Sequence, residues 1–513
     1  MRLISLILIT PFLLSACGPA YLSTPSPTLP PLASNPTLRP RPTVTATPRT
    51  VQPEPLDDDI LTRAQKERLY RASLAYISPT QEDALAAAER LDYVQYAHPS
   101  NMCGPLAIAI LRDAGLVSRY TDLHDFWLLR PDNQAEIIDR TFPSSRFEHF
   151  HFNQSIRDFD FNAFPLKAGD VLYLYAGSQG TFEHILTVTR VDEQGRAYTV
   201  TNLNTQRDGY YVIEEVMLDD PSQPGIGQFY EWTDEKNKWI GMTGFGGFDV
   251  WRFAAPVQDD TPEELALADE LDSIFERAGG EWHAIILDLE TGRRVHDRHS
   301  ADAVHVASVI KAPVAMLLFA SLEAQGVPAS ELPIYLESHG VGRTLAQQLH
   351  AMLVNSEEEA AASLLDTIRK SGLNVNATLA DWGAAHVDVF NRVAPLEEIA
   401  HLMAGLYQGD FVSPQARQII LDLMAEHTPN DDTRLGVLTS LLPEGGEFYN
   451  KRGTITEGRL VVGDAAILIW PSENGRRAYV IVIFGYPGEI PTNDRKLVTG
   501  IEQAALAFWK FAK

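Results

Sequence analysis

The chain has 513 residues, of which 45% are hydrophobic and 9% aromatic, enough apolar material for two or three folded domains. Its formal net charge of −26 at pH 7 disfavours nucleic acid or an anionic membrane surface as a partner. The composition therefore favours a well-solvated protein, and it does not indicate an oligomeric state.

Residues 1–17 have the order of features found in an export signal. Arg2 precedes an apolar stretch over residues 3–14, which is too short to span a bilayer as a mature helix. The letters L-S-A-C that end at Cys17 resemble the lipobox of bacterial lipoproteins. The resemblance implies that Cys17 is lipidated and that the protein is exported and anchored by acyl chains to the outside of the bacterial membrane, in the cell envelope. A plain secretory signal with an incidental cysteine is the alternative.

Two linkers divide the rest of the chain. Residues 18–56 are rich in Pro and Thr and have few large apolar residues, so they predict a disordered, extended linker. A second linker is expected near residues 255–262, where T-P-E-E is typical of a helix N-terminus. The sequence thus predicts two α+β domains, at residues 57–255 and 260–513.

The first domain begins with two expected helices over residues 57–92. Cys103 follows, just before an apolar run that predicts a buried helix ending near Gly115. At a helix N-terminus the unpaired N–H groups and the helix dipole lower the pKa of a thiol, which suits a nucleophile. A buried, inert cysteine is the alternative.

Three strands are expected further along, over residues 170–175, 184–191 and 197–203. His184 opens the middle strand and Asn202 closes the next one. In a hairpin register the two residues fall close together, as an imidazole base and the group that orients it. Asn204, two residues further along the same face, is the second candidate for the orienting group. A histidine at the rim of a sheet is the alternative. Such a strand context is not expected for four other histidines, His98, His124, His149 and His151.

Together, C-G-P at the start of a helix, G-D-V before a strand, and the His184 and Asn202 positions resemble the papain-like superfamily. The bacteriocin-processing-type cysteine peptidases are the most similar branch, over about residues 90–205. The resemblance implies a papain-like fold with Cys103, His184 and Asn202 as catalytic residues. That family has an oxyanion-hole glutamine six residues before the cysteine, where this chain has Ala97. Gln95 and Asn101 are therefore the candidate oxyanion donors.

Three short motifs mark the second domain. S-x-x-K at Ser308–Lys311 places a lysine amine one helical turn from a serine hydroxyl. S-E-E begins at Ser356, and K-R-G-T begins at Lys451 on an expected strand edge. A chain of this length holds about one S-x-x-K by chance, so the order of the three motifs carries the interpretation.

These motifs resemble S-x-x-K, S-D-N and K-T-G of the class A β-lactamases and penicillin-binding proteins, over residues 262–513. The resemblance implies a β-lactamase/transpeptidase-like fold, with a five-stranded antiparallel sheet and a helical lobe over residues 308–430. The expected strands are 283–289, 293–298, 448–454, 460–470 and 477–485, and helix 494–511 packs on the sheet.

The same resemblance implies a role for each motif residue. Ser308 is the acylated nucleophile and supplies an oxyanion N–H, Lys311 tunes it, and Ser356 relays protons. The carboxylate of the substrate is held by Lys451, Gly453 and Thr454. Glu358 and Arg452 depart from the family pattern, and residues 370–395 lack the loop glutamate that drives deacylation. We therefore expect an acyl-enzyme that persists.

The sequence as a whole predicts a lipid-anchored envelope hydrolase with two acyl-transfer modules, acting on peptide or peptidoglycan amide bonds. No metal or cofactor is expected. One alternative is an envelope binding protein that retains both folds without catalysis. Another is a β-lactamase that hydrolyses antibiotics, which requires a deacylating base that the sequence does not reveal.

Overall fold

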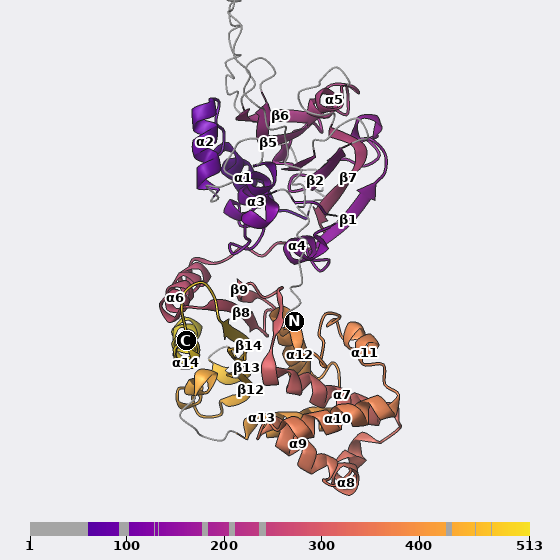
Figure 1. Cartoon of the computed structure of the whole chain (residues 1–513), viewed down its shortest axis with the longest axis vertical. Helices are drawn as coiled ribbons and strands as arrows, with labels where there is room; N and C mark the ends of the chain where they lie inside the picture. Colours follow the sequence, from indigo (N-terminus) through magenta and orange to yellow (C-terminus); the bar gives the residue numbers. More distant parts are fainter. Residues whose placement is uncertain are drawn as a thin grey trace, which may run out of the picture. The chain divides into compact units, whose positions relative to one another are not determined.

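The computed structural model describes residues 60–91, 102–127, 129–131, 133–176, 183–204, 211–234, 243–426, 433–456, 458–472 and 475–513 (Figure 1). Cys17, Gln95 and the linker at residues 18–56 lie outside the described residues. The chain divides into two compact units between Val257 and Gln258.

Two antiparallel sheets and several short helices form the first unit. One sheet has the strand order β1-β7-β2-β3 and the other β4-β5-β6. The helices are α1 (Arg63–Leu74), α2 (Gln81–Arg90), α3 (Cys103–Asp113), α4 (Ala135–Thr141) and α5 (Gln228–Trp232). The strands are β1 (Phe147–Phe152), β2 (Val171–Ala176), β3 (His184–Thr187), β4 (Arg190–Val191), β5 (Ala197–Asn204), β6 (Tyr211–Asp219) and β7 (Thr243–Phe253).

The four-stranded sheet of this unit separates two hydrophobic clusters. Helix α3 packs on one face, where it shares a cluster with Val171, Tyr173 and Ile185. The other face carries Leu172 and Leu174, which pack with α5. This division follows from the alternation of side chains along a strand.

Two details of the first unit differ from the sequence prediction. The expected strand at 184–191 is two strands, β3 and β4, which belong to different sheets. His149 and His151, for which no strand context was expected, lie on β1 beside β7.

A five-stranded antiparallel sheet with the order β12-β13-β14-β8-β9 forms the centre of the second unit, as the sequence predicted. Its helices are α6 (Pro262–Ala278), α7 (Lys311–Ala324), α8 (Leu332–Ser338), α9 (Leu345–Leu353), α10 (Glu358–Ser371), α11 (Val375–Asp381), α12 (Leu396–Gln408), α13 (Pro414–Ala425) and α14 (Asp494–Ala512). Its strands are β8 (Glu281–Asp288), β9 (Arg294–Arg298), β10 (Ala303–His305), β11 (Val393–Pro395), β12 (Glu447–Ile455), β13 (Val461–Ser472) and β14 (Gly475–Tyr486).

The two faces of this sheet are covered by different helices (Figure 1). Tyr479 and Ile481 of β14 face α6 and α14, whereas Val480 and Val482 face the helical lobe. Helix α6 begins where the sequence predicted, with a capping box between Thr261 and Glu264.

Helix α7 is the core helix of the lobe. A 3-10 turn at Ala307–Ile310 leads into it, and the residues from Lys311 to Phe319 are all buried. By length and composition the stretch Ala307–Ala324 could cross a membrane, but most of it is buried inside this unit. A helix that is apolar on every side is stable in water only when other elements surround it, as they do here.

Candidate active site

Ser308 lies in the 3-10 turn that leads into α7. Just before this turn, β10 pairs with β11, and the Val306 N–H donates to the Arg392 carbonyl at 2.8 Å. The preceding residue, Ala307, adopts a left-handed backbone with φ 46°. The turn that contains Ser308 is therefore held in place by the adjoining strand pair.

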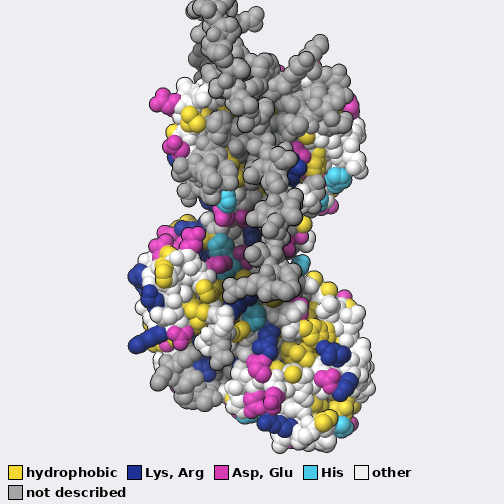
Figure 2. All heavy atoms as spheres, in the orientation of Figure 1, with side chains coloured by type: hydrophobic (Ala, Val, Ile, Leu, Met, Phe, Trp, Pro, Cys, Tyr) yellow, Lys and Arg dark blue, Asp and Glu magenta, His cyan; other side chains and the backbone are white. Residues whose placement is uncertain are grey.

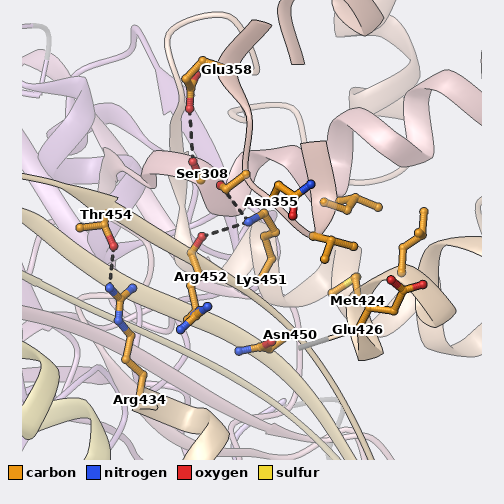
Figure 3. A pocket seen from close by; sticks show the side chains of 14 residues that line it. Ser308, Asn355, Glu358, Met424, Glu426, Arg434, Asn450, Lys451, Arg452 and Thr454 are labelled. Atoms are coloured by element: carbon orange, nitrogen blue, oxygen red, sulfur yellow. Dashed lines mark hydrogen bonds between the residues drawn. The ribbon is translucent and has the colours of Figure 1, made fainter. Parts of the chain in front are cut away.

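Lys311 follows Ser308 by one helical turn, as the S-x-x-K spacing predicted. Its Nζ lies 3.0 Å from Ser308 Oγ. Both residues are buried, and Ser308 lines a cavity of about 500 Å³. Figure 3 shows Ser308, Glu358 and Lys451 around this cavity.

Ser356 connects the two lysines of the site. Lys311 Nζ donates to the Ser356 carbonyl at 2.6 Å and lies 3.3 Å from Ser356 Oγ. Lys451 Nζ, from β12, donates to the same Oγ at 3.0 Å. The structure therefore brings Ser308, Lys311, Ser356 and Lys451 into one hydrogen-bond network, and this placement fits the proton relay expected for Ser356.

The K-R-G-T segment lies directly against the Ser308 turn. A Cβ atom on Gly453 would be 3.0 Å from the Val306 carbonyl oxygen and 3.4 Å from Ser308 N, so the close approach favours glycine. Thr454 also lines the cavity, and its hydroxyl accepts from Arg434 Nη2 at 2.5 Å. The sequence did not single out Arg434, which is buried and also donates to the Gly453 carbonyl at 2.8 Å.

Glu358 reaches the same network from the first turn of α10. Its Oε1 lies 2.7 Å from Lys311 Nζ and accepts from Ser308 Oγ at 3.5 Å. Its Oε2 accepts a hydrogen bond from Arg392. Burial raises the pKa of Glu358, but hydrogen bonds from Arg392 and Lys311 outweigh burial and hold the pKa at about 2. The carboxylate is therefore ionised at neutral pH.

Burial lowers the pKa of both lysines. For Lys311 desolvation lowers the pKa, and the Glu358 carboxylate opposes this effect. For Lys451 desolvation, followed by the positive charge of Lys311, lowers the pKa to about 7. Lys451 thus changes charge near neutral pH.

Backbone strain gathers at this site. Among the described residues other than glycine, those with positive φ are His299, Ala307, Ser356, Arg392 and Arg434. All but His299 adjoin Ser308 or contact the residues around its cavity. Left-handed backbone at such residues persists only where the surrounding structure imposes it, and it is often found at functional sites.

The cavity brings several cations together. Lys451, Arg452 and Arg434 line it, with Glu358 and Glu426 as its carboxylates. The visible surface of the second unit, by contrast, carries acidic and basic side chains side by side (Figure 2). Within the described ranges, no group of three or more His, Cys, Asp and Glu side chains is arranged to hold a metal ion. The cavity suits an anionic ligand.

In the first unit, Cys103 is the first residue of α3, as the sequence predicted, and its side chain is partly exposed. His184 is buried, and burial lowers its pKa to about 3. Its Nε2 lies 2.9 Å from Thr201 Oγ1, and its ring packs against Trp232. The hydrogen bond thus joins His184 to Thr201. Asn202 is the next residue of β5, so its side chain points to the side of the strand opposite that of Thr201.

His184 and Cys103 lie on opposite sides of the four-stranded sheet. On β3, Ile185 packs with α3, and the Thr187 hydroxyl donates to the Ala107 carbonyl of α3 at 3.2 Å. His184 precedes Ile185, so its side chain lies on the other face of the sheet. Its partner on β2, Leu174, also lies on that face. The geometry therefore gives no support to His184 as the base for Cys103.

A different polar cluster of this unit was missed by the sequence reasoning. The buried carboxylate of Asp249 lies 2.6 Å from His151 Nδ1 and 3.3 Å from His149 Nε2, and it accepts from the Tyr175 hydroxyl at 2.6 Å. These side chains line a cavity of about 400 Å³ with Trp251. The i, i+2 spacing of the two histidines was the available signal, since it places both on one face of a strand.

Comparisons with known proteins concern the second unit. Residues 266–512 match the model of a family described as the β-lactamase enzyme family. No curated protein matches the chain.

Solved structures similar to this unit include three that each cover 48% of the chain. A β-lactamase from Chitinophaga pinensis is 19% identical, is covered over 100% of its length and has a TM-score of 0.39. A β-lactamase from Desulfarculus baarsii is 18% identical, with 98% covered and a TM-score of 0.38. The protein PBP-A is 19% identical, with 96% covered and a TM-score of 0.37. Residues 266–512 thus form a β-lactamase-like domain, and the contact between Ser308 and Lys311 fits a serine hydrolase of that type.

Proposed function

We propose that the chain is a cell-envelope serine hydrolase that is acylated at Ser308 by peptide or peptidoglycan-type amides. The observation that carries this proposal is the network of Ser308, Lys311, Ser356 and Lys451 around one cavity. A nucleophile, a proton relay and an anion-binding group are the parts that acyl transfer needs.

In the proposed acylation, Ser308 Oγ attacks the carbonyl carbon of the substrate and the C–N bond breaks. The hydroxyl proton leaves through the hydrogen bonds of Lys311 and Ser356 and ends on the departing amine. Ser308 lies at the start of a helix, where its backbone N–H supports the negative charge that develops on the carbonyl oxygen.

The charges of the cavity support a substrate that carries a carboxylate. Lys451 donates to Ser356 at the cavity wall, and Arg452 stands where the related families have a small hydroxyl residue. A peptide with a free carboxyl terminus meets this requirement, and so does a penicillin. Two functions compete with this proposal: hydrolysis of antibiotics, and ligand binding without catalysis. Acylation of Ser308 would exclude binding without catalysis.

We also propose that acylation of Cys17 anchors the protein to the outer side of the bacterial membrane. The L-S-A-C sequence after an apolar stretch supports this proposal, and the Pro-rich residues 18–56 would separate the anchor from the folded units.

For the first unit, we propose that Cys103 is a reactive thiol in a cysteine-peptidase-like module. Its partly exposed position at the start of α3 supports reactivity. The opposite orientation of His184 means that any base must come from another residue.

Ser308 is expected to be the single residue that penicillin G acylates. Intact-mass measurement of the full chain should show one adduct, which Ser308→Ala abolishes. Lys311→Ala should slow acylation by roughly 100-fold or more, because general acid–base catalysis contributes at least about that factor. Ser338→Ala, a change at an exposed serine of the same unit, is the control and should leave the adduct unchanged. An unlabelled wild-type protein with intact drug would favour the binding-protein alternative.

Binding of a carboxylate-bearing penicillin to the Ser308→Ala protein should weaken as the pH rises above 7. The pKa of Lys451 is lowered to about 7, so its ammonium is present below that pH and lost above it. Calorimetry between pH 5.5 and 8.5 measures the trend, and Lys451→Met should flatten it. Lys496→Met changes an exposed lysine and should retain the wild-type trend. Equal affinity at both ends of this range would contradict carboxylate recognition by Lys451.

Cys17→Ser should abolish lipidation and move the protein from the membrane fraction to the soluble envelope fraction. Cell fractionation with immunodetection checks this, with Cys103→Ser as the control that keeps the anchor. Unchanged membrane association of Cys17→Ser would exclude the lipobox.

Cys103 should be alkylated with an apparent pKa below the ~8.5 of a free cysteine, because it lies at a helix N-terminus. His184→Ala should leave the pH profile of alkylation in place, since His184 lies on the other face of the sheet. Alkylation rates by iodoacetamide over pH 5–10 provide the measurement. An upward shift of the profile in His184→Ala would instead establish the Cys103–His184 pair.

A further inference from the structure

Glu358 occupies an unusual position for a carboxylate. It stands where the S-D-N motif has a neutral asparagine, at the first residue of α10. Its side chain is 56% exposed, yet its Oε1 is within 3.5 Å of Ser308 Oγ. The side chain of Glu358 is therefore open to solvent, and one of its two oxygens lies close to Ser308 Oγ.

The hydrogen-bond pattern places a carboxylate acceptor, Glu358, beside Ser308. Lys311 Nζ donates to Ser308 Oγ, to the Ser356 carbonyl and to Glu358, which uses the three N–H groups of an ammonium. A protonated Lys311 accepts a proton only as it gives one up, as in the proposed relay to Ser356. The hydroxyl of Ser308 instead donates to Glu358 Oε1.

Arg392 fixes the Glu358 side chain in place. Its guanidinium donates to Glu358 Oε2, which leaves Oε1 on the Ser308 side. The backbone of Arg392 is held in turn, because its carbonyl accepts from Val306 N next to the β10–β11 pair. Arg392 thus links the Glu358 carboxylate to the backbone next to the turn that contains Ser308.

Other carboxylates do not take this position in the described part of the chain. Asp388 accepts from the backbone N–H groups of Phe390 and Asn391 in its own loop. Asp381 ends α11 and is exposed. Glu426 lines the far side of the cavity, and no hydrogen bond joins it to Ser308 in the described residues.

We infer that Glu358 is the general base that activates water to hydrolyse the acyl ester of Ser308. This inference rests on the proposed acylation of Ser308. The water oxygen attacks the ester carbonyl carbon while Glu358 takes one water proton. The bond between that carbon and Ser308 Oγ then breaks, and the proton held on Glu358 returns to Oγ. The products are free Ser308 and a carboxylic acid, so no further reactant is needed.

The inference changes what the site does with its substrate. The missing loop glutamate led us to expect an acyl-enzyme that persists. With Glu358 beside Ser308, the acyl-enzyme turns over, and the domain hydrolyses amides by way of an acyl ester. The carboxylate comes from α10 instead of the loop at residues 370–395.

Decay of a preformed adduct tests the role of Glu358 separately from acylation. The full chain is acylated with penicillin G, the free drug is removed, and intact mass is followed over time. Glu358→Gln keeps the size of the side chain and an oxygen for Arg392, and it should slow adduct decay by about 100-fold or more. Glu358→Asp keeps the negative charge but shortens the side chain by one methylene group. The adduct on this variant should decay more slowly than on the wild type and faster than on Glu358→Gln.

The neighbouring Glu357 provides the matched control. Its side chain is partly exposed and forms an ion pair with Arg343 at 2.6 Å. Glu357→Gln removes one negative charge next to the site, and the adduct on this variant should decay at the wild-type rate. Equal decay in the wild type and Glu358→Gln, or a wild-type adduct that persists for hours, would overturn the inference while leaving acylation intact. Absence of any adduct together with absence of hydrolysed drug would overturn the proposed function itself, and this inference with it.

Discussion

The buried ammonium of Lys311 is the constraint on which the second unit depends. It is the charged residue that begins α7, and its side chain is 1% exposed. A buried charge without partners is strongly destabilising, so the surrounding elements must supply acceptors. They do so from Ser308 on the same turn and from Ser356 and Glu358 at the start of α10. Satisfying one ammonium therefore fixes how α7 and α10 meet.

A second buried cation gives the cavity its polarity. Lys451 lies on β12, close enough to Lys311 for the two charges to repel, and Ser356 lies between them. Such an arrangement is more stable once an anion enters, because the anion offsets the repulsion and the desolvation of both amines. Binding of an anionic group and stability of the site are thus linked in this domain.

Much of the second unit could be predicted because its signals are local. The S-x-x-K spacing places Lys311 beside Ser308 through helix geometry alone, and alternating apolar residues mark the strands. The contact between Glu358 and Arg392 could not be predicted in the same way. It depends on the β10–β11 pairing, which joins segments about ninety residues apart, as in Val304↔Ala394.

The first unit shows why a strand register is harder to predict than a strand. The segments around His184 and Asn202 are strands, but the chain leaves one sheet after Thr187 and joins another at Arg190. A hairpin register extrapolated across that break is wrong, and Thr201 pairs with His184 in place of Asn202. Because side chains alternate, a shift of one residue moves a side chain to the opposite face.

The left-handed backbone at Ala307, Ser356, Arg392 and Arg434 has a consequence for the evolution of this domain. Each such residue costs on the order of 1 kcal/mol or more, and a glycine would relieve that cost. Selection for thermal stability alone would therefore act first on residues in and next to this cavity. The strained residues lower the stability of the domain but keep the site preorganised. Substitutions that raise the stability by relieving this strain would loosen the positions of Ser308 and Glu358.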